Sequence, residues 1–145
     1  MTDSFSSKID EARIVDAIKA AESRCRGELR VHIADKSVAD VMKAATLTFE
    51  RLGMTATAER NGVLIFVAPK SQKFAVLGDS GITSRTGTAA LDEIAAAMMT
   101  AFRDGRFTDG LVASVERAGD LLSAHFPRIE GQTDRDELPD TISRG

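Results

Sequence analysis

The sequence predicts an α/β protein, a three-layer αβα sandwich around a small mixed sheet. Apolar residues recur at helical spacing in four segments, and three shorter segments have the composition of strands. Their order along the chain is α-β-α-β-β-α-α. Two strands that flank a helix run parallel through a right-handed crossover, and a strand that follows by a short turn returns antiparallel. Helices are therefore expected on both faces of the sheet.

The first two predicted helices begin at similar polar signatures. Ser7–Asp10 and Ser37–Asp40 each place an acid three residues after a serine, the pattern of a capping box. Gly27 and Gly53 follow the last apolar position of each segment, where glycine commonly ends a helix. The apolar positions are Ile14, Val15, Ile18 and Ala21 in the first helix, and Val38, Val41, Met42, Ala45, Phe49 and Leu52 in the second.

The three predicted strands differ in pattern. In residues 28–33 apolar and polar side chains alternate, which is typical of a strand with one polar face. Val63–Ala68 is apolar throughout, as expected of a strand covered on both faces. Phe74–Leu77 follows the short turn Lys70–Lys73, so these last two strands are expected to form a hairpin.

Two further helices complete the predicted domain. The first starts near Thr88 and ends before Gly105, and the second runs from about Asp109 to Phe126, before Pro127. Their apolar positions are Leu91, Ile94, Ala95, Met98 and Phe102, and then Leu111, Val115, Ala118 and Leu122. We therefore expect one domain over residues 1–126 and a polar C-terminal tail over residues 127–145.

Composition excludes several classes of protein. The 145 residues carry 19 Lys and Arg against 22 Asp and Glu, with no basic stripe and no Trp or Tyr, so nucleic-acid binding is not expected. No apolar run approaches the roughly 20 residues of a membrane span, and the N-terminal residues lack the apolar core of a signal peptide. These features predict a cytoplasmic protein without direct membrane insertion. Cys25 is the single cysteine, which excludes an internal disulfide.

The predicted strand directions gather polar residues at one end of the sheet. Glu28 begins the first strand, Arg60 and Asn61 precede the second, and Asp79 ends the antiparallel third. Carboxylates favour a hard divalent cation, and a metal that also bridges a phosphate would use a neighbouring arginine. We therefore expect Asp79 and Glu28 as metal ligands, with Arg60, Asn61 and Ser80 supporting a phosphate or the site.

The segment Gly78–Gly81, "GDSG", also raises the question of a nucleophilic serine. Such a serine needs a base held by a third group, and the chain offers only His32 and His125, neither at a suitable spacing. Asp79 is thus the better candidate, and Ser80 a turn residue at the start of a loop that runs to Gly87. A structural explanation stays open: Asp79 as a cap of the loop backbone, and Glu28 as a solvated pair with Arg26 or Arg30.

Several motifs together resemble the TPM-domain family, whose members are often labelled phosphatases. They are "AAESRCRGELRVHI", "LGMTATAERNGVLIFVAP", "KFAVLGDSGI", "FRDGRFTDGLVASVERAGDLLSAHFP" and the closing "DELPDTI", which is similar to the short, soluble bacterial branch. The resemblance extends from about Ile14 to Ile142, with departures at Leu91 and Asp136. The family's polar motif positions fall on Glu22, Glu28, Asn61, Gly62 and Asp79.

The resemblance implies an αβα sandwich, a divalent-cation site and, for some members, acid phosphatase-type activity. It also implies accessory roles, since plant members act in photosystem upkeep and others are membrane-anchored. We expect a metal-dependent, phosphatase-like module that uses Ca²⁺ or Mg²⁺ at Glu28 and Asp79. The alternative is a non-catalytic interaction or scaffold module that regulates a protein partner.

Overall fold

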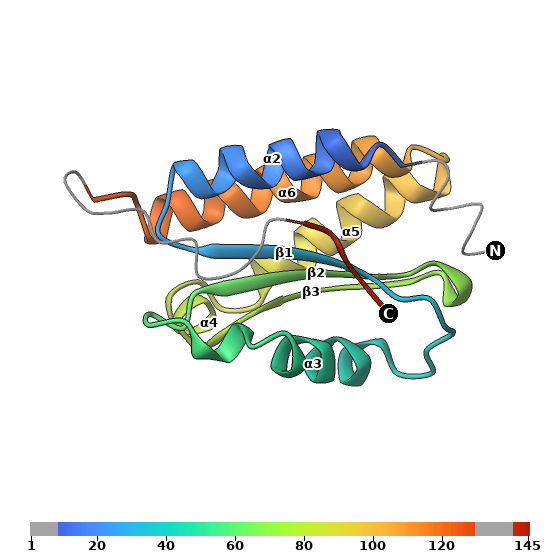
Figure 1. The fold of residues 1–145 in the computed structure, drawn as a ribbon, viewed down its shortest axis with the longest axis horizontal. Coiled ribbons are helices and arrows are strands. Elements are labelled where there is room, and N and C mark those ends of the chain that lie inside the picture. The colour runs from blue at the N-terminus through green and yellow to red at the C-terminus, as the bar shows by residue number, and fades with distance from the viewer. Residues whose placement is uncertain (1–8, 130–140) are drawn as a thin grey trace.

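The computed structural model describes residues 9–129 and 141–145, and within them the αβα sandwich is confirmed (Figure 1). The helices are α2 (Glu11–Ser23), α3 (Val41–Arg51), α4 (Ser80–Thr86), α5 (Ala89–Arg103) and α6 (Phe107–His125). The strands are β1 (Glu28–Ile33), β2 (Gly62–Ala68), β3 (Lys73–Gly78) and β4 (Ser143–Arg144). Single 3-10 turns, η1 (Met54–Ala56) and η2 (Pro69–Ser71), precede β2 and β3. The predicted order holds, with α4 and β4 as additions.

The described strands form one mixed sheet in the order β3-β2-β1-β4. β1 runs parallel to β2, with Glu28 opposite Gly62 and Ile33 opposite Val67. β2 and β3 form the antiparallel hairpin, in which Val63 is opposite Gly78. The strand directions predicted from the order of elements are therefore confirmed.

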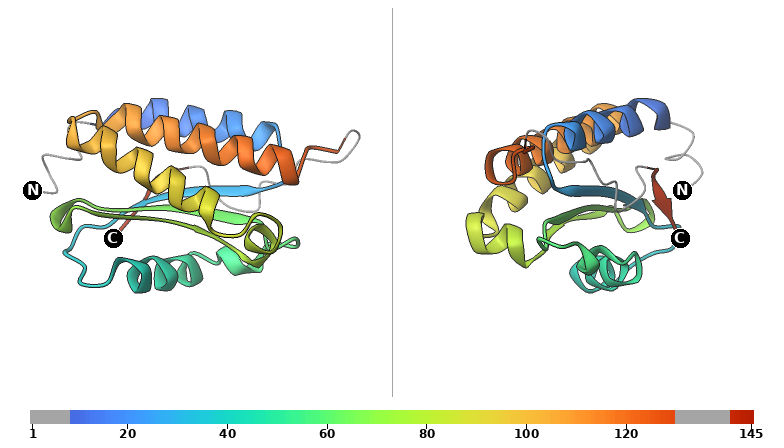
Figure 2. Two further views of the ribbon diagram at one scale, coloured as in Figure 1. Left: turned by 180° about the vertical axis from the view of Figure 1, so that it is seen from behind. Right: turned by 60° about the vertical axis from the view of Figure 1, so that its left-hand side comes forward.

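Helices cover the two faces of the sheet unequally (Figures 1 and 2). α2, α5 and α6 form the larger layer, and the odd-numbered residues of β1 (Leu29, Val31 and Ile33) belong to the core beneath it. α3 covers the other face over a smaller core that includes Phe49, Met54, Leu64 and Phe66. Because side chains alternate along a strand, Glu28, Arg30 and His32 point to the α3 side, where all three are buried.

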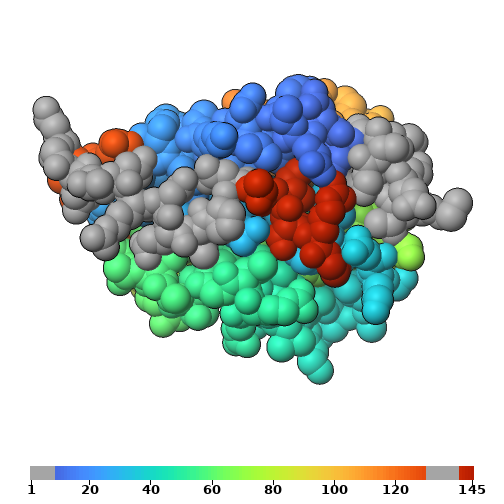
Figure 3. Space-filling model, viewed as in Figure 1, coloured from blue at the N-terminus to red at the C-terminus, as the bar shows by residue number. Residues whose placement is uncertain are grey.

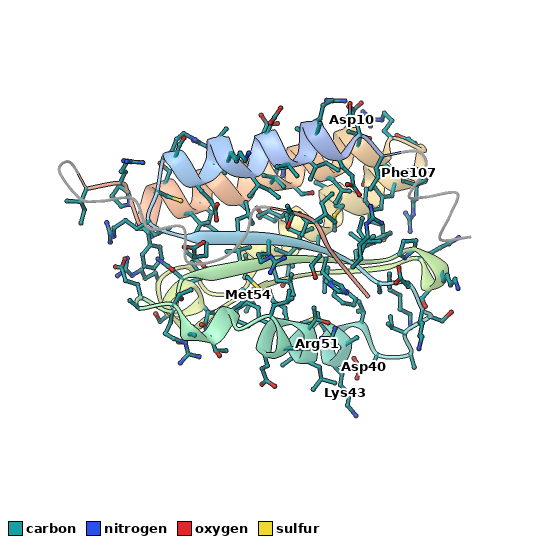
Figure 4. All side chains as sticks on the ribbon, viewed as in Figure 1. Asp10, Asp40, Lys43, Arg51, Met54 and Phe107 are labelled. Atoms are coloured by element: carbon teal, nitrogen blue, oxygen red, sulfur yellow. The ribbon has the colours of Figure 1, made fainter. Side chains whose placement is uncertain are left out.

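Aspartates cap α2 and α3 (Figure 4). Asp10 accepts a hydrogen bond from the Arg13 backbone N–H at 3.3 Å, and Asp40 accepts one from that of Lys43 at 3.1 Å. The expected start of the second helix at Ser37 is thus wrong, because a charged carboxylate at Asp40 satisfies the free N–H group and complements the helix dipole. Ser7 lies outside the described residues.

Residues 80–86 fold as the helix α4, where a loop was expected. Only Ile82 of its seven residues is buried, so no repeating apolar pattern marks it in the sequence. Two contacts stabilise the helix instead. Asp79 caps its first turn. Ile82 packs closely on Gly78, since a methyl group added at Gly78 would lie only 3.0 Å from the Ile82 Cβ.

The last residues of the chain return to the sheet. Ser143 and Arg144 pair in parallel with His32 and Ile33 of β1, within the segment 127–145 that was expected to be a polar tail. Residues 130–140 of that segment lie outside the described part. A two-residue strand has no periodicity that sequence analysis could detect, since tertiary contacts alone define it.

The helical layer contains no candidate membrane span. Among the described residues, no helix combines the length and the apolar character needed to cross a bilayer. The longest of them, α6, has 19 residues, but it carries charged side chains along the face that it turns away from the core.

α2 and α6 approach closely because a glycine faces an alanine. A methyl group added at Gly119 would lie 2.7 Å from the Cβ of Ala21, closer than two carbon atoms can pack. We predict that Gly119→Ala lowers the melting temperature, because overpacking costs about 1–3 kcal/mol and outweighs the ~1 kcal/mol that alanine gains in a helix.

The matched test is the double variant Ala21→Gly with Gly119→Ala, measured by thermal unfolding. It returns the lost space and should recover stability relative to Gly119→Ala alone. A higher melting temperature for Gly119→Ala by itself would contradict this account of the helix contact.

Candidate functional site

The predicted site residues lie at the end of the sheet where β1 and β2 begin and β3 finishes. The Asp79 backbone N–H donates to the Gly62 carbonyl at 2.9 Å, and the Glu28 N–H donates to the Asn61 carbonyl at 3.4 Å. Glu28, Asn61 and Asp79 therefore lie at the same end, as the strand directions predicted.

Asp79 makes several of the contacts at this end of the sheet. It is 8% exposed, and its carboxylate accepts two hydrogen bonds from Arg60, from Nε at 2.7 Å and from Nη2 at 2.9 Å. The same carboxylate accepts the Ser80 backbone N–H at 2.7 Å, which caps α4. The hydrogen bond to Asp79 raises the pKa of Arg60. Such a two-bond, charge-assisted contact holds both partners in one orientation, so Asp79 joins the end of β3 to the loop before β2.

The loop that carries Arg60 is held by its neighbours. Arg60 has a positive φ of 50°, and the next residue, Asn61, is 2% exposed. The Asn61 side-chain amide donates to the Arg26 carbonyl at 3.1 Å, while its backbone N–H donates to Thr57 Oγ1 at 3.3 Å. Asn61 therefore ties the start of β2 to the residues that precede β1, next to Arg60 in the chain.

The glycines of the "GDSG" segment have a packing role. A Cβ at Gly81 would lie 2.2 Å from the Glu59 carbonyl oxygen and 2.6 Å from that of Arg60. The Gly81 N–H donates to that Arg60 carbonyl at 2.8 Å. Glycine is thus required where the loop backbone meets the first turn of α4. Ser80, the exposed first residue of α4, contributes the N–H that Asp79 caps.

The structure does not bring Glu28 against Asp79. Glu28 begins β1 and Asp79 directly follows β3, and β2 lies between these two strands, which places their backbones roughly 10 Å apart. The side chain of Met54 packs against the start of β2, the strand between them: its Cε is 3.4 Å from where a Cβ of Gly62 would be. Glu28 is only 3% exposed, so the alternative of a solvated surface pair is wrong.

A second ion pair, which the sequence analysis did not identify, borders the edge. Arg26 binds both carboxylate oxygens of Glu59 at 2.9 and 3.0 Å. The hydrogen bond between them raises the pKa of Arg26 and lowers that of Glu59. The partners of both ion pairs, Arg26 with Glu59 and Arg60 with Asp79, are too far apart in sequence for spacing to reveal them.

An arginine of α4 also contacts an aromatic ring: the Arg85 guanidinium lies 4.0 Å from the centre of the Phe126 ring.

The arrangement places few metal-binding side chains together. In residues 9–129 and 141–145, no group of three or more His, Cys, Asp or Glu side chains is placed to hold a metal ion. The backbone carbonyls of Glu59 and Arg60 border the first turn of α4 at Gly81, and that of Arg60 accepts the Gly81 N–H.

His32 is the other polar residue of note on β1. It is 1% exposed, its ring stacks on Phe66 at 5.4 Å and 12°, and its Nδ1 is 2.9 Å from Ser143 Oγ. Burial lowers the pKa of His32, and the nearby charges of Arg51 and Arg30 lower it further. The alternation in residues 28–33 predicted that His32 lies on the polar face of the strand. That this face is buried follows from the positions of α3 and β4, which the alternation does not indicate.

Comparison with known proteins gave two findings. A family model described as the TPM domain matches residues 2–121. Among solved structures, the chain is similar to the BA42 protein from the psychrophilic bacterium Bizionia argentinensis, determined by NMR, with 41% sequence identity and a TM-score of 0.84 over 93% of this chain and 92% of that chain. No curated protein matches.

We predict that protonation of His32 opposes folding. An unfolded histidine takes up a proton near its ordinary pKa of about 6.5, whereas the folded one does so at lower pH. Between these values the unfolded state binds more protons, so the free energy of unfolding falls as the pH falls. His32→Asn, which keeps a polar atom near Ser143 but does not titrate, should flatten this dependence in urea unfolding between pH 7 and 5. Equal slopes for the two proteins would contradict it.

Proposed function

We propose that the end of the sheet around Asp79 is a phosphatase-like site that binds a divalent cation together with a phosphate group. The chain belongs to the TPM-domain family. The observation that carries the proposal is the contact between Asp79 and Arg60. A carboxylate able to bind a cation and a guanidinium able to bind a phosphate oxygen are already in contact there. The proposal thus needs no large rearrangement of the fold.

The donor set suits Mg²⁺ better than Ca²⁺. Mg²⁺ keeps several waters and is commonly bound through one or two carboxylates together with a phosphate, whereas Ca²⁺ takes six to eight oxygen ligands. In our proposal Asp79 is the direct ligand, and waters and phosphate oxygens supply the rest of the coordination. Glu28 lies across β2 from Asp79 and would act on the cation through its charge rather than as a direct ligand.

Binding would exchange the partners of Asp79. The Arg60 side chain is 50% exposed while that of Asp79 is 7% exposed, so Arg60 is the partner that can move. A cation at Asp79 would compensate its charge in place of the guanidinium, and would also polarise a bound phosphate oxygen. The released guanidinium would then hold a second oxygen of the same phosphate in its planar fork. Asn61 would keep the loop in place, and Ser80 would keep α4 capped.

The alternative function is a non-catalytic interaction module that regulates a protein partner. The observation that favours it is the way in which β1 holds an extended segment, β4, along its edge. Turnover separates the two functions, since an enzyme must lose its activity in step with loss of the cation. The cytoplasmic location and the lack of nucleic-acid binding stay predictions of the sequence.

We predict that millimolar Mg²⁺ raises the melting temperature and that Asp79→Asn removes most of the rise. A ligand at 100-fold excess over its dissociation constant stabilises the folded state by about 2.7 kcal/mol, which is roughly 5–10 °C for a domain of this size. The Asn side chain keeps the shape and one acceptor oxygen but deletes the charge. Ca²⁺ should give a smaller rise at the same concentration.

Three control variants make the test specific. Asp16→Asn deletes an exposed acid on α2, and Ser80→Ala changes the neighbour of Asp79, so both should keep the full rise. Arg60→Gln removes the competing cation, so it should keep the response to Mg²⁺ but lose any further rise on addition of inorganic phosphate. A melting curve of the unmodified protein that neither ion shifts, with or without phosphate, would contradict the proposed site.

A further inference from the structure

The outer edge of β1 is bound by residues 141–145 of the same chain. Ser143 and Arg144 form the ladder opposite His32 and Ile33. Gly145 extends it, because its N–H donates to the Ile33 carbonyl at 3.3 Å and its carbonyl accepts the Asp35 N–H at 3.0 Å. In Figure 3 this segment, in red, lies on the surface between α2 and α3.

Side chains on the protein recognise this segment as well. His32 Nδ1 is 2.9 Å from Ser143 Oγ, and Arg144 forms an ion pair with Glu11 of α2. Arg30 Nη2 donates to the Thr141 carbonyl at 3.4 Å. The edge therefore offers a contact for a hydroxyl side chain, at His32, and at the next position of the bound segment a contact for a basic side chain, at Glu11.

The Glu22 side chain shortens the part of the β1 edge that another strand can pair with. Its carboxylate, in a residue that is 9% exposed, accepts the Leu29 backbone N–H at 2.9 Å. In a parallel ladder, alternate residues of β1 present their N–H groups to the same side. The first of these groups is thus used by Glu22, and the edge left for a strand extends from Val31 to Asp35, which suits a segment of about five residues.

We propose that the β1 edge is a peptide-docking site for extended segments in which a hydroxyl residue is followed by arginine, and that residues 141–145 occupy it within the chain. Main-chain bonds to a strand edge, combined with separate places for successive side chains, are the features of peptide recognition by strand addition. Two ladder residues hold the segment, and Arg144 is exposed, so a partner peptide of the same pattern can compete for the edge. This inference is independent of the Asp79 site.

The experiment opens the edge in the full chain. Gly145 directs its N–H and carbonyl toward β1, and by the alternation of the ladder so does Ser143. Ser143→Pro removes that donor, and circular dichroism and thermal unfolding check that the domain stays folded. The probe is a synthetic peptide with the sequence of residues 141–145, added to ¹⁵N-labelled protein, with the amides of β1 and the ring of His32 observed by NMR.

We expect the peptide to bind the Ser143→Pro chain at least tenfold more tightly than the unmodified chain. A peptide with Glu in place of its Arg should lose this binding because of repulsion by Glu11, and Glu11→Arg in the opened chain should restore it. If Ser143→Pro fails to fold, Arg144→Glu opens the same edge by repulsion from Glu11.

Two results would overturn the proposal. One is a folded, opened chain whose β1 amides and His32 ring do not respond to millimolar peptide. The other is an unmodified chain that forms dimers by exchange of residues 141–145, detected by size-exclusion chromatography and lost in Ser143→Pro, because the edge would then serve a second copy of the chain.

Discussion

The carboxylate of Asp79 is the group on which the organisation of the candidate site depends. Asp79 directly follows β3, and its carboxylate caps α4 through the Ser80 N–H and accepts two hydrogen bonds from Arg60. A buried carboxylate needs such partners, because an ionised group removed from water without them is strongly destabilising. The loop before β2 and the first turn of α4 can therefore meet only in the arrangement that brings all three donors to this one side chain. The absence of a side chain at Gly81 lets their backbones approach.

The same principle explains the polar side of β1. A strand with buried polar side chains is stable only where neighbouring elements supply hydrogen-bond partners. Glu22 accepts the Leu29 N–H, and Ser143 lies within hydrogen-bonding distance of His32. The free edge of β1 is thus closed partly by a side chain of α2 and partly by the C-terminal segment. An unprotected edge of this kind would otherwise be able to pair with another chain.

Much of the fold could be predicted because it follows from local patterns. Helical periodicity and the order of elements were sufficient for the sandwich and for the parallel and antiparallel pairings, and these pairings brought Glu28, Asn61 and Asp79 to one end. The helix α4 and the strand β4 could not be predicted, since both are too short for a pattern and are stabilised by contacts with distant residues.

The Asp79–Arg60 pair also escaped prediction. It depends on the left-handed conformation of Arg60 and on the register of the β2–β3 hairpin, so Arg60 was assigned to a phosphate without its partner in the protein.

We propose that Arg60 neutralises Asp79 until a cation and a phosphate replace that contact. The most direct measurement is the NMR signal of the Arg60 Nε–H group, which donates to Asp79 at 2.7 Å. We expect this signal to be protected from exchange with water in the protein alone, and Asp79→Asn to remove the protection. Mg²⁺ and inorganic phosphate added together should shift the signal, while phosphate alone should not. A signal that stays protected and unshifted in the presence of both ligands at millimolar concentration would contradict the claim.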